Sequence, residues 1–123
     1  MHRHRLIAVL SIAVLVGACA SSGQPGNATS RDRNRIVAAD WEGLNFVTAL
    51  DAVRRLRSSW LTPRGTAGPP VIYRNSTRWS DNPNGLADID IQSVREMRYL
   101  NATDATTRFG SGFRGGVIIV TTR

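Results

Sequence analysis

The sequence predicts a small α+β domain in which a few short strands pack against one longer and one or two short helices. Three observations predict it. Apolar residues recur every three or four positions between residues 45 and 61, which is the period of a helix. Residues 117–121 are β-branched throughout and indicate a strand at the centre of a sheet. A chain of 123 residues has room for one domain.

Residues 1–18 are typical of a secretory signal peptide. They combine the basic residues Arg3 and Arg5 with an apolar run from Leu6 to Ala18 that ends in small residues. A membrane-spanning helix is the alternative, but residues 6–18 would rise only about 20 Å, against a hydrocarbon core of about 30 Å. We therefore expect residues 1–18 to be removed on export.

Cys19 is the single cysteine of the chain and directly follows Val16-Gly17-Ala18. This motif resembles a bacterial lipobox, whose cysteine is acylated on sulfur and becomes the mature N-terminus. Ordinary cleavage after Ala18 or Ala20 is the alternative, but it would leave an unpaired thiol in an oxidising compartment. The resemblance implies several acyl chains, and two or more hold a protein firmly at a membrane. Ala20 resembles the outer-membrane sorting pattern.

Residues 19–35 are expected to form the lipidated cysteine and a flexible tether, because they are polar and rich in glycine. A flexible chain of this length spans about 20 Å. Apolar periodicity begins at Ile36, so the folded domain is expected over residues 36–123.

The composition argues against an enzyme. All 16 basic residues are arginine, and both histidines, His2 and His4, lie in the signal segment. The mature chain therefore lacks an imidazole base for a nucleophile and a soft-ligand site for zinc. We expect no catalytic residues, no cofactor and no metal.

The positive charge is the second feature of the composition. Without Arg3 and Arg5 the chain keeps 14 arginines against nine acids. This excess favours either a solvated surface or attraction to anionic lipid or an acidic partner, whereas nucleic acid is not expected outside the cytoplasm. Arg54, Arg55 and Arg57 are interpreted in the same two ways, as a solvated helix face or as a binding patch.

The longer helix is predicted over residues 45–61. Its apolar face is expected to comprise Phe46, Ala49, Leu50, Val53, Leu56 and Trp60. Asn45 is expected to cap its start, and Pro63 to end it. Asp51 and Arg55 are four residues apart and are expected to form an exposed ion pair.

The remaining elements are short. Strands are predicted over residues 71–74, 77–79, 95–100 and 117–121, with a turn at Asn75-Ser76, and loops over residues 62–70 and 80–85. A second helix is predicted over residues 101–109. Asp88 and Asp90 could be an acid–base pair or a magnesium site, but Asp90 is better interpreted as the cap of a turn over residues 91–94.

The stretch Gly110-Ser-Gly-Phe-Arg-Gly115 matches the G-x-G-x-x-G spacing of a dinucleotide-binding turn. In that turn the glycines follow a strand and open a helix, whose N-terminal amides receive the pyrophosphate. Here they follow a predicted helix and precede a predicted strand. We therefore interpret Gly110, Gly112, Gly115 and Gly116 as structural turn residues, with Gly110 ending the helix at a positive φ.

An ordered set of motifs fills the C-terminal half: Asp90-Ile91 with Val94, a strand ending at Leu100, a short helix ending in Phe109-Gly110, and the ending Gly116-Val-Ile-Ile-Val-Thr-Thr-Arg123. From Val71 onward this order resembles the plug domain of TonB-dependent receptors. The family usually turns its first hairpin through Asp-Gly, where this chain has Asn75-Ser76. No barrel follows Arg123 in this sequence.

The resemblance implies a plug-like fold that binds rather than transports. We expect a lipid-anchored interaction module at the outer membrane, facing the periplasm. Its partners would be the membrane, through the anchor, and an outer-membrane barrel or a periplasmic protein; no particular small-molecule ligand is indicated. A structural outer-membrane lipoprotein without a defined ligand is the alternative, and an enzyme is a more distant one.

Overall fold

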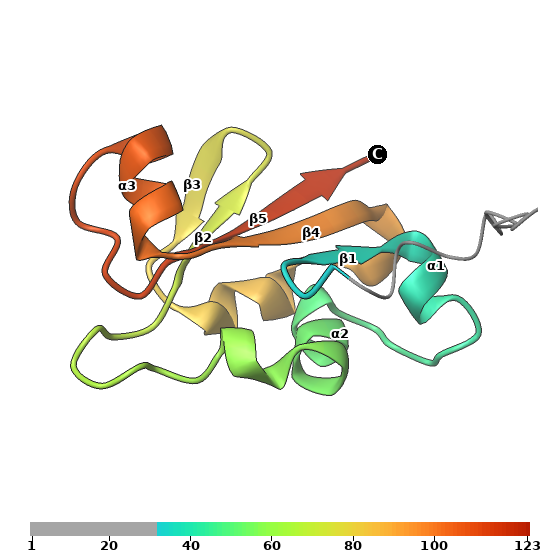
Figure 1. The fold of residues 1–123 in the computed structure, drawn as a ribbon. Coiled ribbons are helices and arrows are strands. Elements are labelled where there is room, and N and C mark those ends of the chain that lie inside the picture. The colour runs from blue at the N-terminus through green and yellow to red at the C-terminus, as the bar shows by residue number, and fades with distance from the viewer. Residues whose placement is uncertain (1–31) are drawn as a thin grey trace, which may run out of the picture.

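The computed structural model describes residues 32–123, which form one mixed sheet with helices on both faces (Figure 1). The predicted α+β class is confirmed. The signal segment, Cys19 and most of the expected tether lie outside the described residues.

The sheet has five strands in the order β1-β4-β5-β2-β3. Only β2 and β5 run parallel; the other neighbouring pairs are antiparallel. β1 and β3 therefore form opposite edges of the sheet (Figure 1). The strand bounds are β1 Arg35–Val37, β2 Val71–Arg74, β3 Thr77–Ser80, β4 Val94–Leu100 and β5 Val117–Thr122.

β5 lies in the middle of the sheet, between β4 and β2, as its β-branched sequence predicts. Because side chains alternate along a strand, Ile118 and Val120 join one apolar cluster, and Val117 and Ile119 join another on the opposite face. None of the four is more than 7% exposed. One strand thus supplies both halves of the core.

The larger cluster lies on the face covered by α2 (Ala49–Leu56) and three 3-10 segments, Ser58–Trp60, Pro83–Asp88 and Ile91–Ser93. Figure 1 shows α2 on one side of the sheet and α3 (Ala102–Phe109) on the other. Trp60 is 4% exposed, which confirms the prediction that it belongs to the core. The buried members of this cluster come from four of the five strands and from the helices on this face: Ile36, Trp41, Ala49, Leu50, Ala52, Val53, Trp60, Ile72, Leu86, Ile89, Ile91, Val94, Met97, Ile118 and Val120.

α2 begins later and ends earlier than the predicted helix. Its N-cap is Thr48, whose hydroxyl accepts from the Asp51 N–H, while the Asp51 carboxylate accepts from the Thr48 N–H and hydroxyl. The predictions of an Asn45 cap and an Asp51–Arg55 ion pair are therefore wrong. This reciprocal capping box satisfies the first amides of the helix and occupies the carboxylate.

α3 lies within one residue of its predicted bounds. Asn101 is its N-cap and accepts a hydrogen bond from the Asp104 N–H at 2.9 Å. Its Ala105 is fully buried and packs with Val71, Phe113, Val117 and Ile119 in the smaller apolar cluster. α3 thereby covers one end of the sheet.

The β2–β3 hairpin turns at Asn75, as predicted. Asn75 has φ 55°, a conformation that asparagine tolerates better than most residues. Its side chain accepts from the Thr122 N–H and donates to the Thr122 hydroxyl, both at 3.0 Å. These bonds tie the hairpin to the end of β5.

The fold begins one residue before the expected boundary at Ile36, because Arg35 already belongs to β1. Ile36 is fully buried opposite Met97 of β4. The short helix α1 (Ala38–Trp41) follows at once and buries Trp41. In the segment expected as a loop, Pro83–Asp88 forms a 3-10 helix that Asn82 caps.

Candidate functional site

Three arginines lie over aromatic rings near β3 and α3. The distances from guanidinium carbon to ring centroid are 5.1 Å for Arg74 over Trp79, 5.6 Å for Arg78 over Phe113 and 5.3 Å for Arg108 over Phe109. Such cation–π contacts favour one position of a flexible arginine. Arg74 alternates with Tyr73 along β2 and lies on the α2 face of the sheet, whereas the other two pairs lie on the α3 face with Tyr73. We call Arg78, Phe113, Arg108 and Phe109, together with the neighbouring edge residue Trp79, the arginine–aromatic surface.

Two of the pairs form a continuous row. The rings of Phe109 and Phe113 are 5.7 Å apart, and Phe109 stacks on Tyr73 of β2 at 4.4 Å. Phe113 is only 6% exposed, whereas Arg78 and Arg108 are exposed. The rings are thus anchored in the smaller apolar cluster, and the two guanidinium groups face solvent above them.

The guanidinium group of Arg78 makes two contacts within the domain. Its Nε donates to Asp81 Oδ1 at 2.7 Å, while its guanidinium lies over Phe113. The side chain remains 53% exposed, and its terminal nitrogens meet no further acceptor among residues 32–123. Arginine donates five N–H groups in a fixed fork, so this side chain retains donors for a carboxylate or phosphate.

Trp79 stands beside Arg78 on the edge strand. Ser80 pairs with Ile72 and Arg78 pairs with Tyr73, so Trp79 is the extra residue of a β-bulge, a feature that redirects side chains. Its indole N–H donates to the Gly85 carbonyl at 3.0 Å, and its side chain stays 41% exposed. An open depression of about 350 Å³ is lined by Arg78, Trp79, Ser80 and Asp81.

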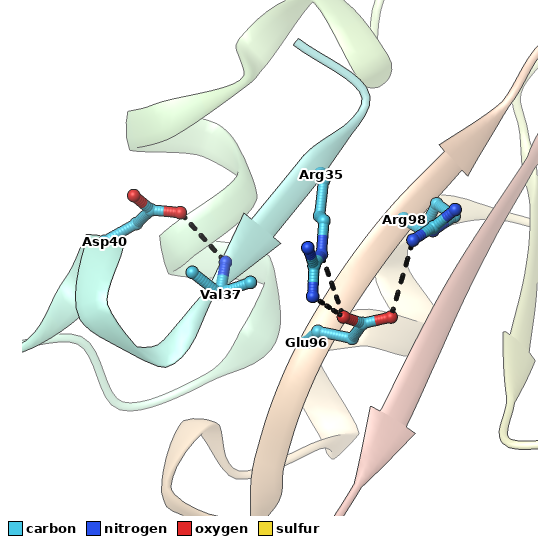
Figure 2. Close-up of polar contacts among 5 residues, drawn as sticks. All are labelled: Arg35, Val37, Asp40, Glu96 and Arg98. Atoms are coloured by element: carbon cyan, nitrogen blue, oxygen red, sulfur yellow. Dashed lines mark hydrogen bonds and ion pairs between the residues drawn. The ribbon is translucent and has the colours of Figure 1, made fainter. Parts of the chain in front are cut away.

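Arginines near the other edge are bonded differently (Figure 2). Arg35 of β1 donates through Nε and a terminal nitrogen to Glu96 of β4, at 2.9 and 2.7 Å, and Arg98 approaches the other Glu96 oxygen at 4.0 Å. Figure 2 also shows the Val37 N–H donating to the Asp40 carboxylate where β1 enters α1. The Arg35–Glu96 contact joins the side chains of β1 and β4.

The four glycines singled out from the sequence lie between α3 and β5. Gly110 is the C-cap of α3, with φ 90°, and donates its N–H to the Thr106 carbonyl at 2.9 Å. Gly112 and Gly116 also have positive φ, at 105° and 82°. A Cβ at Gly116 would overlap the Leu100 carbonyl oxygen, and one at Gly115 the Pro69 carbonyl oxygen. A strand follows these glycines, not a helix.

Asp88 and Asp90, considered above as an acid–base pair or a magnesium site, have different structural roles. Asp90 caps the 3-10 turn Ile91–Ser93 by accepting from the Gln92 N–H at 2.8 Å, and Asp88 ends the preceding 3-10 segment. Within residues 32–123 no three acidic, histidine or cysteine side chains gather as a metal site. No helix in that range is long and apolar enough to cross a membrane.

Sequence reasoning missed the arginine–aromatic surface. The signal available was the adjacency of arginine and aromatic residues in Arg78-Trp79, Arg108-Phe109 and Phe113-Arg114. Adjacent side chains in a strand point to opposite faces, so this signal does not pair Arg78 with Phe113. That pairing needs the fold, which brings residues 35 positions apart into contact.

Comparisons with known proteins identify no relative: no family model, no curated protein and no solved structure matches the chain.

Proposed function

We propose that this protein is a lipid-anchored interaction module of the bacterial outer membrane, plug-like in fold, that binds a protein partner through the arginine–aromatic surface. The observation that carries the proposal is the pair of exposed arginines, Arg78 and Arg108, held over aromatic rings near the exposed Trp79. Arginine and tryptophan are the side chains that most often dominate binding energy in protein interfaces.

The anchoring part of the proposal rests on the sequence around Cys19. We expect Cys19→Ser to leave a signal-bearing or soluble protein that no longer partitions with the outer membrane. Membrane fractionation tests this. A Cys19→Ser protein that has lost its signal, yet remains in the membrane pellet after washing with high salt, would contradict lipid anchoring.

The binding part is tested by affinity capture from detergent-solubilised envelope. Wild-type lipoprotein is compared with the double variant Arg78→Gln/Arg108→Gln and with Arg55→Gln, an exposed arginine on α2 on the other face of the sheet. We expect a stoichiometric partner with the wild type and Arg55→Gln and its loss from the double variant. Capture of lipid alone by all three favours the alternative, a structural lipoprotein without a defined ligand.

A further inference from the structure

The elements around the arginine–aromatic surface carry an unbalanced charge. Residues 71–81 and 102–116 contain Arg74, Arg78, Arg108 and Arg114 against Asp81 and Asp104. Asp104 is engaged at the start of α3, where Asn101 donates to its carboxylate, and Asp81 holds the Nε of Arg78. Among residues 32–123 the terminal donors of Arg78 and Arg108 meet no further acceptor, so they are available to an anion from outside the domain.

We propose, building on the partner-binding function above, that the partner presents an extended acidic segment whose carboxylates bind the guanidinium groups of Arg78 and Arg108. The next apolar or small side chain of that segment would enter the depression lined by Arg78, Trp79, Ser80 and Asp81. The ligand class is therefore a protein segment with spaced aspartate or glutamate residues.

The spacing of the row accommodates an extended chain that contacts both arginines. The steps from the Arg108 guanidinium to Phe109, to Phe113 and to the Arg78 guanidinium are 5.3, 5.7 and 5.6 Å. The two guanidinium groups are thus at most three such steps apart. Residues two and four positions apart on one side of an extended chain are separated by about 7 and 13 Å, which places two carboxylates within reach of the two arginines.

The bonding of the aromatic rings favours a protein over a lipid surface. Side chains that insert into a bilayer interface present an apolar body to the lipid and a free polar end to the headgroups. Here the indole N–H of Trp79 is bonded to the Gly85 carbonyl, and Phe113 is buried beneath Arg78. The surface offers charged donors in fixed positions, which suit directional recognition of carboxylates.

The test uses the detergent-solubilised lipoprotein and a synthetic peptide of about nine residues with glutamate at alternate positions. Trp79 reports binding by fluorescence, since Trp41 and Trp60 are only 5% and 4% exposed. We expect saturable binding with a Kd below about 1 mM, at least about tenfold weaker for Arg78→Gln/Arg108→Gln. Raising the salt to about 0.5 M should also weaken it.

Three controls make the result specific. The same peptide with glutamine at each glutamate position should not bind, and Arg55→Gln should bind the acidic peptide as the wild type does. Melting curves of the double variant should match those of the wild type, so that a loss of binding is not a loss of fold. Inorganic phosphate and vesicles containing anionic phospholipid are titrated in parallel.

Absence of saturable peptide binding overturns the inference. Equal or tighter binding of phosphate or of anionic vesicles overturns it in favour of a phosphate-bearing ligand. If the envelope partner is captured in an Arg78- and Arg108-dependent manner while the peptide does not bind, the proposed function stands and the acidic-segment inference alone fails.

Discussion

Arginines near the two edges of the sheet are used in different ways. Near β1, Arg35 and Arg98 approach the carboxylate of Glu96, and Arg57 donates to the carbonyls of Leu56 and Asp32. Near β3, Arg78 and Arg108 lie over aromatic rings, and an ion pair joins Arg78 to Asp81. The first group donates to acceptors within the domain, and the second keeps its terminal donors toward solvent.

This difference predicts that chemically identical side chains differ in their contribution to stability. An arginine bonded to Glu96 contributes to the attachment of β1, so its removal changes stability. An arginine that lies over a ring and faces solvent contributes less to folding, and under the proposed function its removal changes affinity for a partner. The arginines of the domain therefore comprise at least two populations with different contacts.

The largest expected effect comes from deleting β5, the strand that connects the two regions. Truncation after Gly116 removes Val117, Ile118, Ile119 and Val120, each contributing roughly 1.5 to 3 kcal/mol through burial. The sum is comparable with the whole stability of a small domain, about 5 to 15 kcal/mol. We expect an unfolded protein by circular dichroism. A truncated chain that still melts cooperatively would show that the two edges do not depend on a shared central strand.

The next effect concerns the glycine-rich turn that leads to Phe113 and β5. Gly116→Ala should destabilise the domain by about 2 kcal/mol or more, because it adds backbone strain to overlap with the Leu100 carbonyl. Gly110→Ala and Gly112→Ala should cost about 1 kcal/mol, since their φ values are positive but no atom lies within 4 Å of the added Cβ. Thermal melts of the three variants give the order.

The same variants test the dinucleotide interpretation of these glycines. We expect no binding of NAD, FAD or ATP at about millimolar concentration, because a strand follows the glycines where a phosphate site needs a helix N-terminus. Calorimetric titration of the wild type checks this. Saturable nucleotide binding that Gly110→Ala and Gly112→Ala abolish without changing the melting temperature would contradict a purely structural role.

Local signals in the sequence predicted much of this fold. The short helix α3, the hairpin turn at Asn75 and the β-branched strand β5 each depend on neighbours in the chain, and each lies within one residue of its predicted position. The sequence predicts a start for α2 that is too early, because Asn45 and Thr48 are both suitable N-cap residues and only Thr48 caps the helix. The Thr48 and Asp51 pair, three residues apart, was the better signal.

Contacts between residues far apart in the chain could not be predicted from local sequence patterns. β1 is three residues long and is a strand because it pairs with β4, some sixty positions later, so no periodicity reveals it. The arginine–aromatic surface likewise joins a residue of β3 to the turn before β5. Pairings of this kind depend on strand order and register, which the sequence alone did not specify.

The comparison of the two edges is tested most directly by Glu96→Gln and Arg78→Gln. Glu96→Gln should lower stability by about 1 kcal/mol, since its partially exposed ion pairs with Arg35 and Arg98 are weakened, and high salt should reduce the difference. Arg78→Gln should change stability by less than about 0.5 kcal/mol. Urea denaturation of both variants measures this. A larger loss for Arg78→Gln would assign that arginine a structural role.

The smallest effect should be seen in the pH dependence of Asp51, the acid that bonds to a helix cap rather than to an arginine. Hydrogen bonds from the backbone and side chain of Thr48 lower the pKa of Asp51 below the ordinary value for an aspartate. A carboxyl with a lowered folded-state pKa stabilises the fold above its unfolded pKa, and this contribution is lost as pH falls through the folded value.

The Asp51→Asn variant should therefore have a lower melting temperature than the wild type at neutral pH. The difference in melting temperature should disappear once the pH is below the folded-state pKa of Asp51. Arg55→Gln should leave the pH profile unchanged, because Asp51 is bonded to Thr48. If Arg55→Gln changed the pH profile as much as Asp51→Asn does, the Asp51–Arg55 ion pair expected from the sequence would form after all. Arg55 would then be a structural arginine on α2.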